Sequence, residues 1–138
     1  MKSAGTENDA APPTILAVDD DAHIRRIIER ALKSEGYRMR MCVSAETALE
    51  ALREQRYAVA ILDVMMTGET GFQLAHRIRA GEAGEENREV PIVFVTAEND
   101  AEAYEKSFDV GAYRYITKPF DTDSLVGVVS AMLHEGGG

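Results

Sequence analysis

The stretch Tyr57-Ala-Val-Ala-Ile-Leu-Asp63 decides the fold, because it is a short and almost continuously apolar run that ends in an acid. Such a run is typical of a strand buried on both faces, as in a parallel sheet covered by helices. A second run, Thr14-Ile-Leu-Ala-Val18, ends at two further acids. Since parallel strands end at the same edge of a sheet, we expect Asp19, Asp20 and Asp63 to lie together there.

Apolar runs and amphipathic stretches alternate along the chain, which predicts an α/β fold with a doubly wound, five-stranded parallel sheet. The predicted strands lie near residues 14–18, 37–42, 57–63, 91–95 and 112–116, and the predicted helices near 22–34, 45–54, 70–80, 100–109 and 121–134. A strand order of 2-1-3-4-5 places strands one and three side by side at the point where the order reverses, which is where open sheets bind ligands.

The length of 138 residues fits one domain. We expect this domain at 14–134, between a flexible N-terminal tail, 1–13, and a Gly-rich C-terminal tail, 135–138. The segment 80–89 is rich in glycine and acid, which predicts a solvated loop rather than a phosphate cradle.

Composition narrows the possible partners. The net charge of −9 disfavours direct contact with nucleic acid or an anionic membrane, so we expect a protein partner. No apolar stretch approaches the roughly 20 residues of a membrane-spanning helix, and the N-terminus lacks an apolar signal-peptide core. With a single cysteine, Cys42, the pattern predicts a cytoplasmic protein.

The clustered acids predict a cation site, because carboxylates held close together resist ionising unless a small hard cation neutralises them. Mg²⁺ fits such a site, and Mn²⁺ could replace it. The same sheet edge receives Thr96 after the fourth predicted strand and Lys118 after the fifth. Acids, a cation, a hydroxyl and a fixed positive charge together suit a phosphoryl group.

Several motifs, in this order and spacing, resemble the response-regulator receiver domains of two-component signalling, in particular the single-domain chemotaxis regulators. They are Ile15-Leu-Ala-Val-Asp-Asp-Asp21, Ile61-Leu-Asp-Val-Met-Met66 with Gly71-Phe72, Val95-Thr-Ala97, Gly111-Ala112 and Tyr115-Ile-Thr-Lys-Pro-Phe120. The resemblance covers about residues 14–134 and implies a flavodoxin-like (βα)5 receiver fold. The expected strand order rests partly on it, since chemotaxis members have that order.

The resemblance implies that Asp63 is the phosphoacceptor, which takes a phosphoryl group from a histidine kinase or a histidine phosphotransfer protein. It also implies that Asp20 and Asp63 ligate Mg²⁺ directly and that Asp19 does so through water. The backbone carbonyl of Met65 would complete the protein's share of the ligands.

The remaining signature residues are implied to bind the phosphoryl group and to switch. Lys118 would pair with the phosphoryl oxygens, and Thr96, with Ala97 beside it, would donate its hydroxyl. Tyr115 would change rotamer as that hydroxyl moves, and the bond before Pro119 would be cis. The surface of the fourth helix, fifth strand and fifth helix would then change its affinity for a downstream protein.

Four residues are predicted to meet partner proteins. Tyr104 could form an exposed apolar patch with Tyr115, and Phe120 follows the fifth strand. Arg25 and Arg26 lie on the first helix, which docks on the kinase in the resembling family. The fifth helix lacks the arginines of dimerising family members, so we expect a monomer or a weak dimer.

Three positions depart from or vary within the family. Thr67 stands four residues after the phosphoacceptor, where the family often has proline, which frees a backbone donor and predicts a looser loop. Met65 and Glu98 occupy positions that tune self-hydrolysis in this family.

Other functions fit the sequence less well. We expect no enzymatic activity beyond Mg²⁺-dependent self-phosphorylation from small donors and slow self-dephosphorylation. A haloacid-dehalogenase-like phosphohydrolase would need an aspartate in place of Met65, and a flavodoxin-like electron carrier would need a phosphate loop where the acids 19–21 stand. Two alternatives stay open: a phosphorylation-independent pseudo-receiver, and a receiver cut from a longer multidomain regulator.

Overall fold

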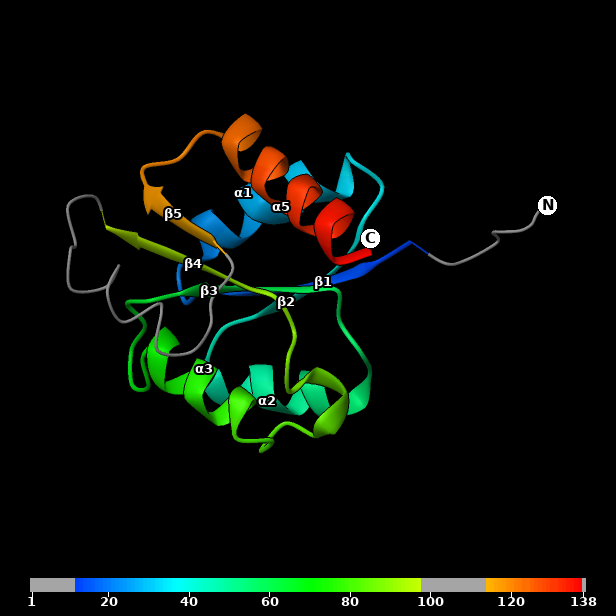
Figure 1. Ribbon diagram of the computed structural model, residues 1–138. Helices are drawn as coiled ribbons and strands as arrows, with labels where there is room; N and C mark the ends of the chain where they lie inside the picture. The colour runs from blue at the N-terminus through cyan, green and yellow to red at the C-terminus, as the bar shows by residue number, and fades with distance from the viewer. Residues whose placement is uncertain (1–11, 98–113, 138) are drawn as a thin grey trace.

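The computed structural model describes residues 12–97 and 114–137, which form a parallel sheet between two layers of helices (Figure 1). The strands are β1 (Thr14–Val18), β2 (Arg38–Cys42), β3 (Val59–Asp63), β4 (Ile92–Ala97) and β5 (Arg114–Lys118). The helices are α1 (Ala22–Lys33), α2 (Ala45–Glu54), α3 (Gly71–Arg79), α5 (Thr122–Gly137) and the short 3-10 helix η1 (Glu85–Asn87). The strand order β2-β1-β3-β4-β5, with every pair parallel, confirms the predicted doubly wound fold.

The sheet separates two hydrophobic cores, and the alternation of side chains along the central strands assigns each residue to one of them. Helices α2 and α3 cover one face, and α1 and α5 cover the other (Figure 1). The core beneath α2 and α3 takes Leu16, Ala60, Leu62, Ile92 and Phe94 from the strands, whereas the core beneath α1 and α5 takes Ile15, Ala17, Ile61, Val93 and Val95. Because β3 is buried along its whole length, the position of its last residue is fixed from both sides.

Helix starts follow their local sequence signals. Ser44 caps α2 and Thr70 caps α3, each in a reciprocal capping box with the residue three positions later. The chain leaves α1 through Gly36, whose φ of 94° is costly for residues with a side chain. The edge position of β2 agrees with its alternating apolar and basic sequence.

Several predicted boundaries move by one to three residues. The fifth strand was expected at 112–116 but spans Arg114–Lys118, because its register with β4 pairs Ala97 with Lys118. Helix α5 continues to Gly137, beyond the predicted end at 134. Residues 135–137 are therefore helical and not the predicted Gly-rich tail, since glycine weakens a helix by about 1 kcal/mol without forbidding it. The predicted helix 100–109 lies outside the described residues.

The segment 80–89 is not the fully solvated loop that its composition predicts. It contains η1, and the side chain of Asn87 is completely buried. The side-chain Oδ1 of Asn87 accepts from the Tyr57 N–H at 2.9 Å. The side-chain Nδ2 donates to the backbone carbonyls of Leu52 and Gln55 at 2.7 and 2.8 Å. One side chain therefore joins the end of α2 to the beginning of β3.

Replacement of this side chain should destabilise the whole domain. Asn87→Ala leaves a buried N–H and carbonyl groups without their partner, so we expect the free energy of unfolding to fall by about 3 kcal/mol. Urea denaturation measures the change. The neighbouring exposed Glu86→Ala should stay within about 0.5 kcal/mol of wild type, and an equally small effect of Asn87→Ala would contradict the role of this contact.

Candidate functional site

The register of β1 and β3 brings two acids together at the carboxyl edge of the sheet. Val18 pairs with Leu62, so Asp19 and Asp63, each one residue further along, are neighbours. Asp20 joins them, and one carboxylate oxygen from each of the three residues lies within 4.8 Å of the others. The predicted convergence of the three acids is thus observed.

The three consecutive acids at 19–21 have three different environments. Asp19 is 1% exposed, and its Oδ1 accepts from the Asp21 N–H at 2.9 Å. Asp21 is exposed and caps α1 by accepting from the N–H of His23 and Ile24. Asp20 is exposed and reaches toward the loop that follows β3, between Asp63 and α3. Only Asp21 matches the helix-capping role that lone acids at strand ends often have.

Lys118 lies between the two buried acids. It is the last residue of β5, and its Nζ is 3.3 Å from Asp19 Oδ2 and 3.4 Å from Asp63 Oδ1. Its side chain keeps 28% exposure, so the ammonium is reachable from solvent while it contacts the buried carboxylates. This position agrees with the predicted place of the lysine at the sheet edge.

The electrostatics of the site follow from burial and from these pairs. Burial, and after it repulsion from Asp19, raises the pKa of Asp63 from 3.8 to about 6, even though attraction to Lys118 opposes both effects. Burial alone would lower the pKa of the Lys118 ammonium, but attraction to Asp63 and Asp19 outweighs burial and leaves its pKa above the ordinary value for lysine. Asp63 therefore holds its negative charge against the preference of its surroundings.

Of the other predicted switch residues, Thr96 and Ala97 lie at the end of β4, whereas Tyr115 lies near the beginning of β5. Thr96 is buried and the adjacent Ala97 is exposed, and they pair with Thr117 and Lys118 of β5. Tyr115 is half-buried and packs against the core beneath α2 and α3. The bond between Lys118 and Pro119 is cis, as expected.

The loop that follows Asp63 approaches it closely. A Cβ atom on Gly71 would lie 2.4 Å from the carbonyl oxygen of Asp63, so only glycine fits there without movement of the backbone. The Met65 N–H donates to Asp63 Oδ1 at 3.4 Å, while the Met65 side chain is 67% exposed. Met66, by contrast, is buried in the core beneath α2 and α3.

Thr67 contacts the acid cluster directly. Its N–H and its Oγ1 donate to Asp20 Oδ2 at 2.8 and 3.0 Å. The hydrogen bond from the Thr67 N–H is the main reason why the pKa of Asp20 lies below its ordinary value. The backbone donor that the absence of proline frees is therefore engaged, whereas the sequence alone suggested a looser loop.

The predicted partner residues divide into different environments. Arg25 is half-buried, and its Nη1 donates to the backbone carbonyl of Asp19 at 2.7 Å, so it supports the acidic loop. Arg26 is exposed and lines a hollow of about 590 Å³ along α1, with Thr122 at the start of α5. Phe120 is half-buried against the core beneath α1 and α5. Tyr104 and Glu98 lie outside the described residues.

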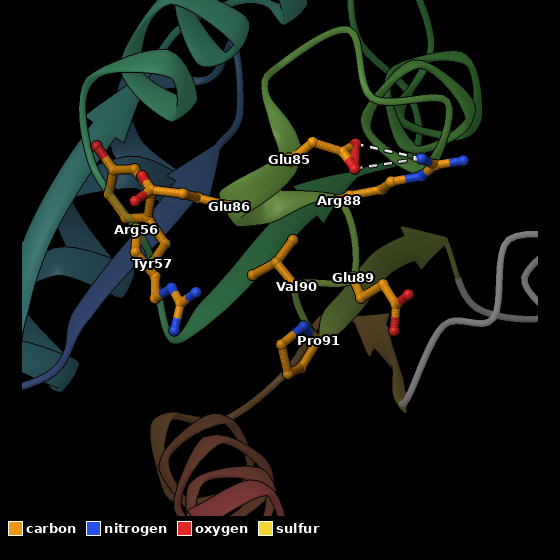
Figure 2. Close-up of a pocket in the computed structure, with 8 residues that line it drawn as sticks. All are labelled: Arg56, Tyr57, Glu85, Glu86, Arg88, Glu89, Val90 and Pro91. Carbon is orange, nitrogen blue, oxygen red and sulfur yellow. Dashed lines mark hydrogen bonds and ion pairs between the residues drawn. The ribbon is translucent and has the colours of Figure 1, made fainter.

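A second hollow, of about 380 Å³, lies at the amino ends of β3 and β4 (Figure 2). The acid cluster lies at the other ends of these strands. The lining of the hollow mixes both signs of charge, and Arg88 pairs with Glu85 at 3.2 Å. Open parallel sheets bind ligands at their carboxyl ends, so the acid cluster is the better candidate for a functional site.

The acid cluster suits a divalent cation by the chemistry of its donors. Carboxylate oxygens are the ligands that Mg²⁺ and Mn²⁺ prefer. Two of the acids, Asp19 and Asp63, are almost completely buried side by side, which is costly for like charges. Asp20 adds an exposed oxygen at the open side, so the residues present fit an Mg²⁺ ion.

Comparison of the sequence with known protein families identifies a family that matches this chain. The profile of the response regulator receiver domain family matches residues 15–130, which is most of the chain. The chain therefore belongs to the response-regulator receiver family of two-component systems.

Curated relatives include the transcriptional regulatory proteins RprY of Bacteroides fragilis and AfsQ1 of Streptomyces coelicolor. RprY is 34% identical over 119 residues, and AfsQ1 is 35% identical over 124 residues. The matches cover 86% and 90% of this chain but 48% and 52% of the relatives. The chain thus spans about half the length of the curated relatives it matches.

Solved structures give the same fold. The chemotaxis protein CheY4 of Vibrio cholerae superposes with a TM-score of 0.82 at 29% identity, over 89% of this chain and all (100%) of that one. The receiver domain of the sensor histidine kinase PA1611 of Pseudomonas aeruginosa superposes with a TM-score of 0.79 at 28% identity, over 90% and 99% of the two chains. That structure has a magnesium ion coordinated in its active site cleft. Within the described part of this chain, no helix has the length and apolar character needed to cross a membrane.

The raised pKa of Asp63 predicts a dependence of stability on pH. A carboxyl whose pKa is about 6 in the folded state stabilises the fold at low pH and loses that contribution as pH rises from about 4 through 6. Asp63→Asn should therefore be more stable than wild type at pH 7 without metal, by on the order of 1–3 kcal/mol. The gain should shrink toward pH 4, as measured by urea denaturation in EDTA.

Added Mg²⁺ is the control for this comparison. It should stabilise wild type at pH 7 and leave Asp63→Asn nearly unchanged. A variant that is no more stable than wild type at pH 7 would show that ionised Asp63 is not repelled in the folded state.

Proposed function

We propose that the protein is a phosphorylation switch in which Asp63 accepts a phosphoryl group from a phosphohistidine. The observation that carries this proposal is the position of Lys118, whose ammonium contacts both Asp19 and Asp63 at the open edge of the sheet. A fixed cation beside a buried carboxylate of raised pKa favours the approach of an anionic phosphoryl donor, which a cluster of acids alone would repel.

The transfer makes specific demands on the residues of the site. A carboxylate oxygen of Asp63 attacks the phosphorus, a P–O bond forms, and the P–N bond to the donor histidine breaks. Asp19 and Asp20, with the Met65 carbonyl, would hold Mg²⁺ together with Asp63. The bound ion would neutralise the phosphoryl oxygens and align the donor. The Lys118 ammonium, which pairs with the Asp63 carboxylate before transfer, would then pair with the phosphoryl oxygens.

The switch itself would pass through the ends of β4 and β5. The new acceptor oxygens favour a conformer that brings the Thr96 hydroxyl and Lys118 closer to Asp63. Thr96 pairs with Thr117 of β5, so a movement of Thr96 would be transmitted to β5, the strand that carries Tyr115. A coupling of about 1–3 kcal/mol would change the affinity for a partner by roughly 5- to 150-fold.

The partners follow from this chemistry. The donor is a histidine kinase or a histidine phosphotransfer protein, and the exposed Arg26 on α1 belongs to the surface that it would meet. The recipient of the signal is a downstream protein that reads the β5 and α5 surface. Apart from self-phosphorylation with small donors and slow loss of the phosphoryl group, we propose no enzymatic activity.

Phosphorylation of the intact protein by acetyl phosphate tests the proposal. With Mg²⁺, wild type should gain the mass of one phosphoryl group in intact-protein mass spectrometry, and EDTA should prevent the gain. Asp63→Asn should gain nothing, because an amide cannot form the acyl phosphate. Lys118→Ala should react more slowly, since the cation that attracts the donor is gone.

The pseudo-receiver alternative predicts a different result. A module that is read without phosphorylation would show no Mg²⁺-dependent gain in mass in wild type. An equal gain in wild type and Asp63→Asn would place the modification elsewhere and reject Asp63 as the acceptor.

A further inference from the structure

Thr67 is joined to the acid cluster although it lies 47 residues from Asp20 in sequence. Both of its donors, the backbone N–H at 2.8 Å and the hydroxyl at 3.0 Å, meet the same carboxylate oxygen, Asp20 Oδ2. Two donors on one oxygen restrict rotation of the carboxylate, because a turn about its terminal bond would break both hydrogen bonds.

The loop around Thr67 is built to hold this position. Met66 is buried in the core just before it. Gly68 follows with a φ of 85°, a conformation in which the chain can turn back at little cost. Further on, Glu69 pairs with Arg77 at 2.6 Å, and Thr70 caps α3. Thr67 is therefore held between anchored neighbours when it reaches across to the β1–α1 loop.

Asp20 needs such support more than the other two acids. Asp19 and Asp63 are almost completely buried, and Lys118 contacts both. Asp20 is exposed, so packing does not fix its carboxylate. The hydrogen bonds from the Thr67 N–H and hydroxyl orient this side chain instead.

We propose that Thr67 is a positioning residue for the divalent cation: it holds Asp20 Oδ2, so that Oδ1 is presented to the ion. This inference rests on the metal site of the proposed function and adds a residue that the acid cluster alone does not identify. Residues that hydrogen-bond a metal-binding carboxylate orient it, and their loss typically weakens metal affinity by about 10- to 100-fold. The backbone half of the contact requires a residue with an N–H, which proline lacks.

A graded series of variants tests the role of Thr67. Thr67→Ser keeps both donors, Thr67→Val keeps the N–H alone, and Thr67→Pro removes both. We expect Mn²⁺ affinity, measured by electron paramagnetic resonance of the free ion, to fall about 10-fold in Thr67→Pro. Thr67→Val should lie between this variant and wild type, and Thr67→Ser should be close to wild type.

Thr70→Val is the matched control. It makes the same threonine-to-valine change in the same loop. It removes the α3 cap, because the Thr70 hydroxyl accepts from the Gln73 N–H, and it leaves the hydrogen bonds from Thr67 to Asp20 in place. We expect a lower melting temperature and unchanged Mn²⁺ affinity. If Thr67→Pro fails to fold, Thr67→Val decides the question, since it keeps the backbone contact and the side-chain shape.

The amide proton of residue 67 supplies a second measurement in Mg²⁺ titrations followed by ¹⁵N–¹H nuclear magnetic resonance. If Thr67 supports the ion, the hydrogen bond persists in the bound form and the amide stays protected from solvent exchange. Loss of that protection on Mg²⁺ binding would show that Thr67 competes with the ion and would overturn the proposal.

The outcomes separate this inference from the proposed function. Variants Thr67→Val and Thr67→Pro that bind Mn²⁺ as tightly as wild type, or more tightly, would reject the role of Thr67 and leave the switch intact. Wild type that binds neither ion would reject the metal site and both proposals with it.

Discussion

The burial of two neighbouring carboxylates is the constraint on which the rest of the structure depends. Asp19 directly follows β1, Asp63 ends the adjacent β3, and both are almost completely shielded from water. Charges within 4.8 Å of one another repel by about 3 kcal/mol or more at an effective dielectric constant near 20. Lys118 offsets part of this repulsion, and the remainder favours a proton or a cation. The site is therefore already selective for positive charge.

The fold can tolerate this repulsion because Asp19 and Asp63 lie at the ends of strands that are almost entirely buried. β1 and β3 are packed by helices on both faces, so the backbone of Asp63 cannot move away from Asp19 without disturbing both cores. The side of the site that remains adjustable is formed by the loop after β3 and by the end of β5. Because Asp19 and Asp63 are fixed, a change of charge at the site would be accommodated by movement of this loop and of the end of β5, which alters the protein surface there.

Much of this arrangement could be predicted from the sequence, since it depends on local pattern and on general rules of topology. The apolar run before Asp63 predicted a central strand, and parallel topology then predicted that the three acids meet. The roles of Arg25, Asn87 and Thr67 could not be predicted, because each acts through a contact with a residue that no sequence pattern connects to it. The Asn87 side chain bonds residues more than 30 positions earlier, and nothing in 80–89 distinguishes it from a solvated asparagine. Strand ends moved for a similar reason, since the register with a neighbouring strand decides where pairing stops.

The charge balance of the site explains why phosphorylation can act as a switch there. The three acids and Lys118 carry two net negative charges when all are ionised, so a divalent cation makes the site neutral. Phosphorylation of Asp63 removes one carboxylate charge and adds about two on the phosphoryl group. The site with its cation bound thus gains only about one negative charge. That charge lies on the phosphoryl group, farther from β3, where Thr96 and Lys118 can approach it. Because the total changes little while its position changes, the response is a movement of these two residues and not a loss of the ion.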